Sequence, residues 1–162
     1  DLRGLSCHFL LDVDGTLYKS PKAPGGDPVW YFHAHSFGAP KAPGYDGRWI
    51  LSVLSRARHS VLDPTVKTVI LTGRPDHPPM RKKVLSLLRL TGLRFDAVVL
   101  QPIPFSGTTA QYKKSVVDQW LKQLPSVRKV VFYDDEQDNL LSVGKTVERC
   151  GVQYKAYLTP GM

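Results

Sequence analysis

Short apolar runs alternate with longer amphipathic segments along this chain of 162 residues. The apolar runs have the length of buried strands, and they lie at residues 7–11, 68–71, 95–100, 129–133 and 153–158. Between them, apolar residues recur at helical spacing, which predicts helices at about 46–58, 78–92, 109–122 and 139–150. This alternation predicts an α/β fold, a three-layer sandwich with a mostly parallel five-stranded central sheet.

Residues 19–45 interrupt the pattern, because they are rich in proline, glycine and aromatic residues. This composition predicts mostly loop, with room for a short hairpin. The chain carries no internal repeat or low-complexity tract, and its length suits one folded unit. We therefore expect residues 1–162 to form a single domain, with an insert at about 19–45.

Polar residues follow three of the predicted strands directly. They are Asp12-Val13-Asp14-Gly15-Thr16, Thr72-Gly73-Arg74 and Asp134-Asp135. Each motif alone is typical of a turn or a helix cap. Parallel strands, however, bring all three to one sheet edge, where ligands of α/β proteins bind. One like-charge carboxylate pair at about 4 Å costs roughly 4 kcal/mol at an effective dielectric near 20, so we expect a hard divalent cation such as Mg²⁺ among them.

The motifs also resemble those of a known family. Phe9-Leu10-Leu11 followed by Asp12-Val13-Asp14-Gly15-Thr16-Leu17 looks like the first signature of the haloacid dehalogenase (HAD) superfamily. Thr72 resembles the second signature, Lys113 or Lys114 the third, and Asp134-Asp135 the fourth. Within the superfamily, the chain looks like the Swiss Army Knife RNA repair-like branch. Tyr112-Lys113 resembles the Phe-Lys pair of that branch and favours Lys113, whereas its paired tryptophans are represented only by Arg48-Trp49 and the distant Trp30.

The resemblance implies a Rossmannoid HAD phosphatase without a full cap domain, since about 18–67 is short for an independently folded cap. It implies that Asp12 is the nucleophile, forming an aspartyl phosphate, and that Asp14 is the general acid and base. Mg²⁺ would be held by the Asp12 carboxylate, the Asp14 backbone carbonyl and Asp134, with Asp135 a ligand through water or a neighbour. Thr72, Gly73 and Lys113 would bind the phosphoryl group. Arg74 is either a substrate contact or a salt-bridge partner.

Charge and aromatic content bear on the substrate. The net charge of +8 favours a polyanionic partner, although it is also compatible with a merely basic surface. Six aromatic residues at 30–49 either stack on bases or attach the loop to the body, and we favour attachment for most of them. The leading prediction is a phosphatase of polynucleotide 3′-phosphate ends, of RNA or DNA, in nucleic-acid repair. The alternatives are a phosphatase of small metabolites or nucleotides, an inactive nucleic-acid-binding module and, last, a receiver-type signalling domain.

Other features add little. Cys7 and Cys150 are expected to be buried and unbridged in a reducing compartment. There is neither a secretory signal pattern nor an apolar run of membrane-spanning length, so we expect an intracellular protein. His33, His35 and His77 have no metal-binding spacing and are expected in loops or at the surface. The chain lacks a phosphate-binding loop of the kinase type and so has no kinase half of its own. The family resemblance suggests that it is one part of a larger multidomain repair protein.

Overall fold

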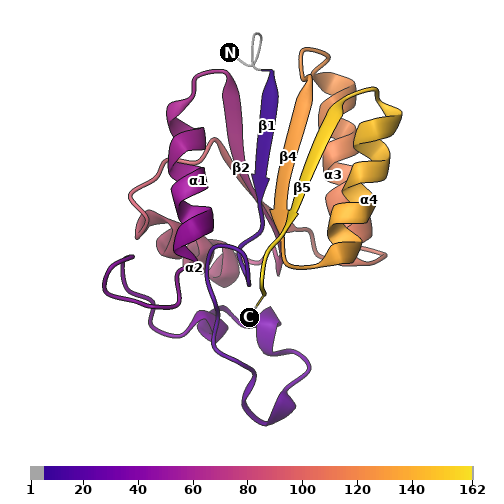
Figure 1. Cartoon of the computed structure of the whole chain (residues 1–162). Coiled ribbons are helices and arrows are strands. Elements are labelled where there is room, and N and C mark those ends of the chain that lie inside the picture. Colours follow the sequence, from indigo (N-terminus) through magenta and orange to yellow (C-terminus); the bar gives the residue numbers. More distant parts are fainter. Residues whose placement is uncertain (1–5, 162) are drawn as a thin grey trace.

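A five-stranded parallel sheet forms the centre of the molecule, in the computed structural model that describes residues 6–161 (Figure 1). The strands lie in the order β3-β2-β1-β4-β5, and each neighbouring pair is parallel. Their bounds are β1 Cys7–Leu11, β2 Val66–Pro75, β3 Ala97–Gln101, β4 Lys129–Asp134 and β5 Gln153–Leu158. The predicted five-stranded α/β fold is therefore confirmed, with a sheet that is parallel throughout.

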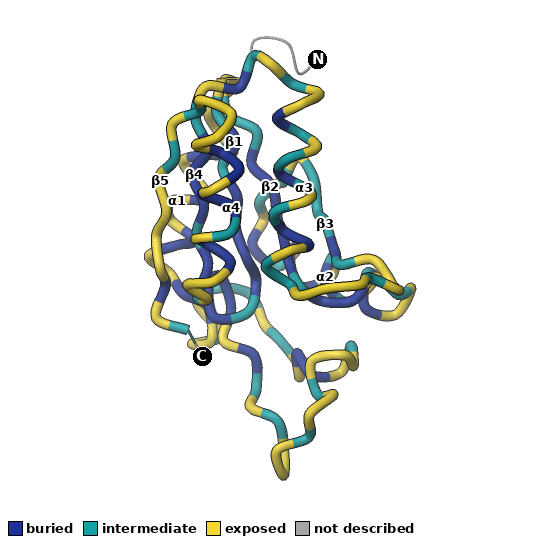
Figure 2. The backbone as a smooth tube through the Cα atoms, turned by 90° about the vertical axis from the view of Figure 1, so that its right-hand side faces the viewer, coloured by how far each residue is buried: buried dark blue, intermediate teal, exposed yellow. Residues whose placement is uncertain are grey.

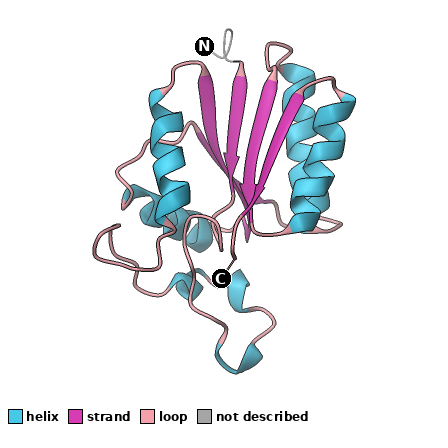
Figure 3. Cartoon of the chain, viewed as in Figure 1, coloured by secondary structure: helices cyan, strands magenta, loops and turns pink. Residues whose placement is uncertain are grey.

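Helices cover both faces of the sheet, as the secondary-structure view makes plain (Figure 3). Helices α1 (Leu51–Leu62) and α2 (Pro78–Arg89) lie on one face, and α3 (Thr109–Gln123) and α4 (Gln137–Arg149) lie on the other. Successive strand residues point to opposite faces, so Leu11 joins the core under α1 and α2 while Leu10 joins the core under α3 and α4. The central strands are buried along nearly their whole length (Figure 2).

The strand order places a crevice beside β1. The chain moves from β1 to β2 and β3 in one direction, and β4 and β5 lie on the other side of β1. The carboxyl ends of β1 and β4 are therefore neighbours at the point where the order reverses, which is where open α/β sheets bind ligands. The Asp12 amide donates a hydrogen bond to the Tyr133 carbonyl over 3.0 Å and holds these two strand ends together.

Several predicted element boundaries were off by a few residues, and two of the differences bear on the site. Strand β2 does not stop at Thr72 but continues to Pro75, across a register shift against β3. Helix α1 begins at Leu51 rather than at Asp46. The Asp46 carboxylate accepts hydrogen bonds from the Arg48 amide and the Tyr18 hydroxyl, both at 3.0 Å, and thereby fixes a turn before the helix.

The insert consists of loop and three short 3-10 helices, η1 (Pro24–Gly26), η2 (Trp30–Phe32) and η3 (Ala34–Phe37), and contains no hairpin within 19–45. It lies below the carboxyl edge of the sheet (Figure 1). Body side chains attach it by binding its backbone carbonyls. His77 Nε2 lies 2.9 Å from the Phe32 oxygen, and Lys83 donates to the Gly38 oxygen over 3.2 Å.

The six aromatic residues at 30–49 divide evenly. Phe37 and Trp49 are buried in the core, and Trp30 is partly buried. Tyr31, Phe32 and Tyr45 are exposed, so the predicted attachment does not hold for most of the six. Among the smaller predictions, both cysteines are free as expected, but neither is buried, since Cys7 is partly exposed and Cys150 is exposed. Within residues 6–161, no helix is both long and apolar enough to cross a membrane.

A buried histidine in β1 makes the stability of the fold depend on pH. The His8 side chain is 2% exposed, its Nε2 atom has no hydrogen-bond partner, and burial lowers its pKa from 6.5 to about 4. The unfolded chain therefore binds a proton before the native one does, so stability is complete above pH 6.5 and falls as pH drops towards 4. We expect the free energy of unfolding to lose about 1 to 3 kcal/mol from this source between about pH 6.5 and 4.5.

Urea unfolding of the wild type, of His8→Leu and of His59→Gln at several pH values measures this effect. His8→Leu should flatten the pH dependence, and His59→Gln, at an exposed site on α1, should leave it unchanged. Equal pH dependence in all three proteins would rule out His8 as its source.

Candidate active site

The predicted nucleophile lies at the crevice. Asp12 directly follows β1 and is only 6% exposed. The chain then turns sharply, because the amides of Thr16, Leu17 and Tyr18 all donate to the Val13 carbonyl over 3.0 to 3.2 Å. This turn directs Asp12 and Asp14 to the carboxyl edge of the sheet.

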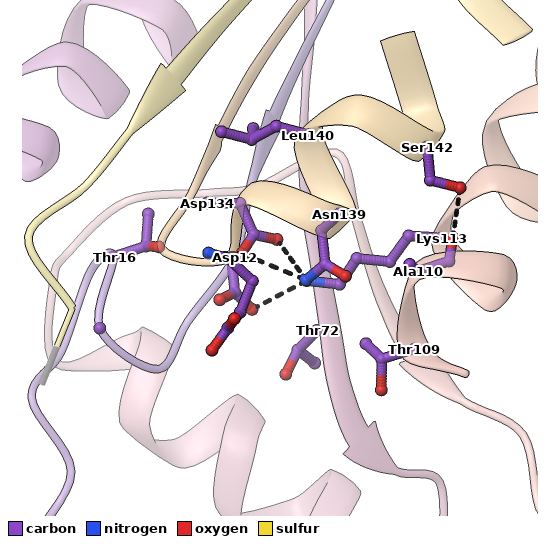
Figure 4. A network of polar contacts seen from close by, with 12 residues as sticks. Asp12, Thr16, Thr72, Thr109, Ala110, Lys113, Asp134, Asn139, Leu140 and Ser142 are labelled. Atoms are coloured by element: carbon purple, nitrogen blue, oxygen red, sulfur yellow. Dashed lines mark hydrogen bonds and ion pairs between the residues drawn. The ribbon is translucent and has the colours of Figure 1, made fainter. Parts of the chain in front are cut away.

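Lys113 is the lysine that reaches the acidic residues. Its side chain extends from the first turn of α3, is 1% exposed, and donates to Asp12 Oδ1 over 3.2 Å and to Asp134 Oδ2 over 2.7 Å. Asn139, from α4, donates to both oxygens of Asp134 over 3.2 and 3.1 Å, so that Asp12, Asp134 and Asn139 surround the end of Lys113 (Figure 4). Burial lowers the pKa of Lys113, but the two carboxylates outweigh burial and raise it, so the lysine stays charged. Lys114, the alternative, is partly exposed.

Three carboxylates form a group with the composition of a cation site. Asp12, Asp134 and Asp135 each offer one oxygen atom, and these atoms lie within 4.8 Å of one another. Burial raises the pKa of Asp12 well above its usual value and raises that of Asp135 to about 6. Against three negative charges, Lys113 supplies one positive charge. A divalent cation balances the remaining two, and an all-oxygen ligand set suits magnesium, so the residues present fit the expected ion.

Asp14 is not part of this group, because its carboxylate is occupied by an arginine. Arg74 binds it through two parallel hydrogen bonds, Nε to Oδ2 over 2.8 Å and Nη2 to Oδ1 over 2.7 Å. Ser20 adds a third hydrogen bond to Oδ1, over 2.6 Å. Only one donor reaches Oδ2, so this oxygen keeps a lone pair for a proton. The Asp14 backbone carbonyl remains a predicted magnesium ligand.

Arg74 is itself held on every side. The side chain is 2% exposed, Nη1 donates to the Tyr31 carbonyl over 3.0 Å and to the Ser36 hydroxyl, and the guanidinium carbon lies 3.9 Å from the centre of the Phe37 ring. The structure thus places Arg74 in the predicted salt bridge to a neighbouring acid. Arg74 is also a wall residue of the cavity described below, so its other predicted role, a substrate contact, stays a prediction.

Two of the three predicted phosphate-binding residues, Thr72 and Gly73, lie on β2. Thr72 is fully buried, and its hydroxyl accepts a hydrogen bond from the Arg74 amide over 3.1 Å. Gly73 lines the cavity opposite the start of α3, where an added Cβ atom would lie 2.8 Å from Thr109 Cγ2. Thr109 and Ala110, the first residues of α3, also line the cavity. A helix N-terminus offers free amides and a partial positive charge, which favours a bound phosphate.

One cavity of about 470 Å³ is lined by Asp12, Asp14, Gly73, Arg74, Lys113 and Asp135, whereas Thr72 and Asp134 are not among its wall residues. Sequence reasoning missed other residues of its surroundings, among them Ser20, Ser36, Thr109 and Asn139. Asn139 follows the Asp134-Asp135 pair at the first turn of the next helix, a position that signals proximity to the strand end. The two serines in the insert carry no such signal.

Gly15 lies directly beside the acidic group of Asp12, Asp134 and Asp135. Its φ is +74°, and an added Cβ atom would collide with Asp135 Oδ2. Gly92 has φ +72° with nothing within 4 Å, so Gly92→Ala meets only the backbone penalty of about 1–2 kcal/mol. We expect Gly15→Ala to lower the melting temperature more than Gly92→Ala does, and to weaken Mg²⁺ binding measured by calorimetry. Equal losses of stability with unchanged Mg²⁺ affinity would contradict this role.

Comparisons with known proteins agree with the geometry. The HAD domain of effector protein Lem4 from Legionella pneumophila aligns with a TM-score of 0.61 and 16% identity, over 97% of this chain and 88% of that chain. A chain of a Pnkp1/Rnl/Hen1 complex aligns with a TM-score of 0.64 and 15% identity, over 99% of this chain but only 48% of its own length. Effector Ceg4 from Legionella pneumophila aligns with a TM-score of 0.58 and 13% identity, over 95% of this chain and 86% of that chain. At these identities the likeness concerns the fold, and a search of curated proteins found no match.

Family membership is established by the sequence. The family described as HAD domain family 1 in Swiss Army Knife RNA repair proteins matches residues 27–155, which is most of the chain and includes Lys113, Asp134 and Asp135. The match begins after the first motif, which contains Asp12 and Asp14. The resemblance to the family is confirmed, and the chain belongs to the HAD domain family of Swiss Army Knife RNA repair proteins.

Proposed function

We propose that this chain is a Mg²⁺-dependent phosphomonoesterase that acts through an aspartyl phosphate on Asp12. The observation that carries the proposal is the grouping of Asp12, Asp134 and Asp135 around one point, with the Lys113 ammonium bound to two of them. Such a buried acidic group is costly to the fold unless it binds something positive. A carboxylate poised beside cationic groups is the arrangement that attack on a phosphate monoester requires, because the nucleophile must approach a dianion.

In the first step, an Asp12 oxygen attacks phosphorus and the bond from phosphorus to the leaving oxygen breaks. The leaving oxygen takes the electron pair and receives a proton from Asp14 Oδ2. Arg74 and Ser20 fix the orientation of the Asp14 carboxyl group through their hydrogen bonds to it. Lys113, Thr72 and the Gly73 amide would bind the phosphoryl oxygens, and Lys113 offsets the charge that develops there.

In the second step, water attacks the phosphorus of the aspartyl phosphate. Asp14 accepts the proton of this water, the bond between phosphorus and the Asp12 oxygen breaks, and phosphate and free Asp12 result. Mg²⁺ would be held by the Asp12 carboxylate, the Asp14 backbone carbonyl and Asp134, with Asp135 a ligand through water or a neighbour, and it would neutralise negative charge on the phosphoryl group when bound. The chain's own residues supply the nucleophile, the proton carrier and the positive charge of Lys113.

For the substrate, we propose the 3′-phosphate end of a polynucleotide, in nucleic-acid repair. Three observations support a large polyanionic substrate: the family is named for RNA repair proteins, the net charge is +8, and the insert leaves the cavity open at the carboxyl edge. The chain matches 48% of one chain of a Pnkp1/Rnl/Hen1 complex, which supports a place within a larger repair protein.

Phosphate release tests the function directly. We expect release from 3′-phosphorylated oligonucleotides in Mg²⁺, and loss of release in EDTA that is restored by excess Mg²⁺. Matched 5′-phosphorylated oligonucleotides should be poorer substrates, and para-nitrophenyl phosphate tests turnover of an ester without a nucleic acid. Release from para-nitrophenyl phosphate alone would support a phosphomonoesterase but exclude the polynucleotide as its substrate. Release from no substrate would overturn the proposed function.

A further inference from the structure

A second hollow adjoins the phosphoryl cavity and has a different chemical character. It has a volume of about 360 Å³ and shares two wall residues, Gly73 and Thr109, with the phosphoryl cavity. Its other walls come from the insert and from the loop between β3 and α3, and include Phe32, Ile103 and Phe105. We call this hollow the aromatic groove. The aromatic groove begins at the predicted phosphate-binding turn. The group that is bonded directly to a phosphate held at this turn is therefore the part of a substrate that reaches the groove.

The aromatic groove offers flat apolar surfaces and one polar edge. Phe32 is 54% exposed and Ile103 is 51% exposed, so the core does not use these side chains. The Phe105 ring is held by an edge contact with Tyr112, with ring centres 5.8 Å apart. Gln101 Oε1 accepts a hydrogen bond from Thr109 over 3.1 Å, which leaves the amide N–H groups of Gln101 as donors at the wall. Aromatic faces beside a hydrogen-bond donor suit a nucleobase.

A basic hollow lies along α2. It has a volume of about 610 Å³, and its wall residues include Asp76, Arg81, Lys82 and Arg89. The Asp76 amide donates to the Gln101 carbonyl over 2.8 Å, so a wall residue of this hollow lies directly beside a wall residue of the aromatic groove. Arg81 is paired with Asp76 through two hydrogen bonds of 3.0 and 3.1 Å. Lys82 and Arg89, both exposed, are left to give the hollow its positive charge.

The order of these sites follows the chain itself. Gly73 lies at the phosphoryl cavity, Pro75 at the aromatic groove, and Asp76 and Arg81 at the basic hollow. The sites thus follow one another in the order phosphate site, aromatic groove and positive charge. The end of a polynucleotide presents its groups in the corresponding order, namely the terminal phosphate, the nucleoside and the next phosphate. A free nucleotide or a small metabolite has nothing to place in the basic hollow.

We propose that the nucleoside bearing the scissile phosphate binds in the aromatic groove, with its base against Phe32 and Phe105, and that the following phosphates cross the basic hollow at Lys82 and Arg89. This inference rests on the proposed function, whose substrate it defines as a polynucleotide end with an intact terminal base. Phe32 and Phe105 then determine specificity, whereas Lys82 and Arg89 supply affinity that is independent of sequence.

Equilibrium binding tests the aromatic groove without catalysis. Asp12→Asn protein is titrated with a fluorescent 3′-phosphorylated oligonucleotide and with the same oligonucleotide carrying an abasic 3′-terminal residue. The abasic oligonucleotide should bind at least about fivefold more weakly, the lower range for stacking of one base. Phe32→Ala, added to Asp12→Asn, should abolish this preference, and Phe105→Leu, which keeps bulk beside Tyr112, should reduce it. Tyr45→Ala is the control, since Tyr45 is an exposed insert aromatic that lines none of the three hollows.

The salt dependence of the same binding tests the basic hollow. Replacing Lys82 and Arg89 together by glutamine should reduce the slope of log Kd against log salt by about 1.4, at about 0.7 for each phosphate contact of a single strand. The double replacement of Arg56 and Arg58, exposed arginines of α1, removes the same charge elsewhere and should change the slope less.

The outcomes separate this inference from the proposed function. Equal affinity for the intact and abasic ends, or a preference that survives Phe32→Ala and Phe105→Leu, would overturn the nucleoside site even if the wild type releases phosphate. Equal slopes for the two double variants would overturn the basic hollow. A base preference that depends on Phe32, in a protein that releases phosphate from no substrate, would support the groove and reject the phosphatase.

Discussion

Asp12→Asn is expected to abolish phosphate release and, in the absence of metal, to make the fold more stable. Asparagine cannot supply the anionic oxygen that attacks phosphorus, so we expect a loss of at least about 10³-fold in kcat. Asp12 is buried beside Asp134 and Asp135, and burial already raises its pKa. The neutral amide removes one of three crowded charges and can still accept the hydrogen bond from Lys113. We therefore expect the free energy of unfolding to rise by about 1 to 3 kcal/mol without metal.

Activity and thermal unfolding, each with and without Mg²⁺, measure the two effects together. Mg²⁺ should raise the melting temperature of the wild type more than that of Asp12→Asn, because the variant has lost one ligand charge. Asp63→Asn is the control, since Asp63 is an exposed aspartate that follows α1 and lies outside the acidic group. An active Asp12→Asn protein would exclude Asp12 as the nucleophile. An inactive variant that is less stable than the wild type would mean that Asp12 supports the fold instead.

Strands and helices with a clear hydrophobic period were predictable from the sequence. Strand β5 has the predicted limits, and α3 differs from its prediction by one residue, because the apolar positions and the capping box of Thr108 and Gln111 depend on local sequence alone. The start of α1 was not predictable. It depends on Asp46 and Tyr18, which are 28 residues apart, and no local pattern reveals a contact at that distance.

The acidic part of the candidate site was also visible in the sequence, because parallel topology brings the ends of β1 and β4 together. The residues that surround Asp14 could not be identified from the sequence. Ser20, Tyr31 and Ser36 belong to an insert without periodic pattern, and their contacts with Arg74 depend on how that insert folds back on the body. Sequence reasoning left Arg74 open between a substrate contact and a salt bridge for this reason.

A second arginine–aspartate pair in the structure allows the role of Arg74 to be measured by comparison. Arg74 is 2% exposed and binds Asp14 through two hydrogen bonds, whereas Arg81 makes an equivalent two-bond contact with Asp76 at the surface, where the side chains are 42% and 36% exposed. The two pairs share chemistry and geometry but differ in burial. The surface pair is worth about 0–1 kcal/mol, while breaking a buried pair leaves a charge without its partner in a poorly solvated site.

Arg74→Met is therefore expected to cost about 2 to 4 kcal/mol of stability and on the order of 10²-fold in kcat, because Asp14 loses both its partner and its fixed orientation. Arg81→Met should cost less than about 1 kcal/mol. Adding Asp14→Asn to Arg74→Met should restore part of the stability but none of the activity, and the double-mutant cycle should give a coupling free energy of about 1 to 3 kcal/mol. Urea unfolding and phosphate release measure these quantities. If Arg74→Met unfolds like the wild type and only weakens oligonucleotide binding, Arg74 acts on the substrate and Asp14 is oriented by Ser20 alone.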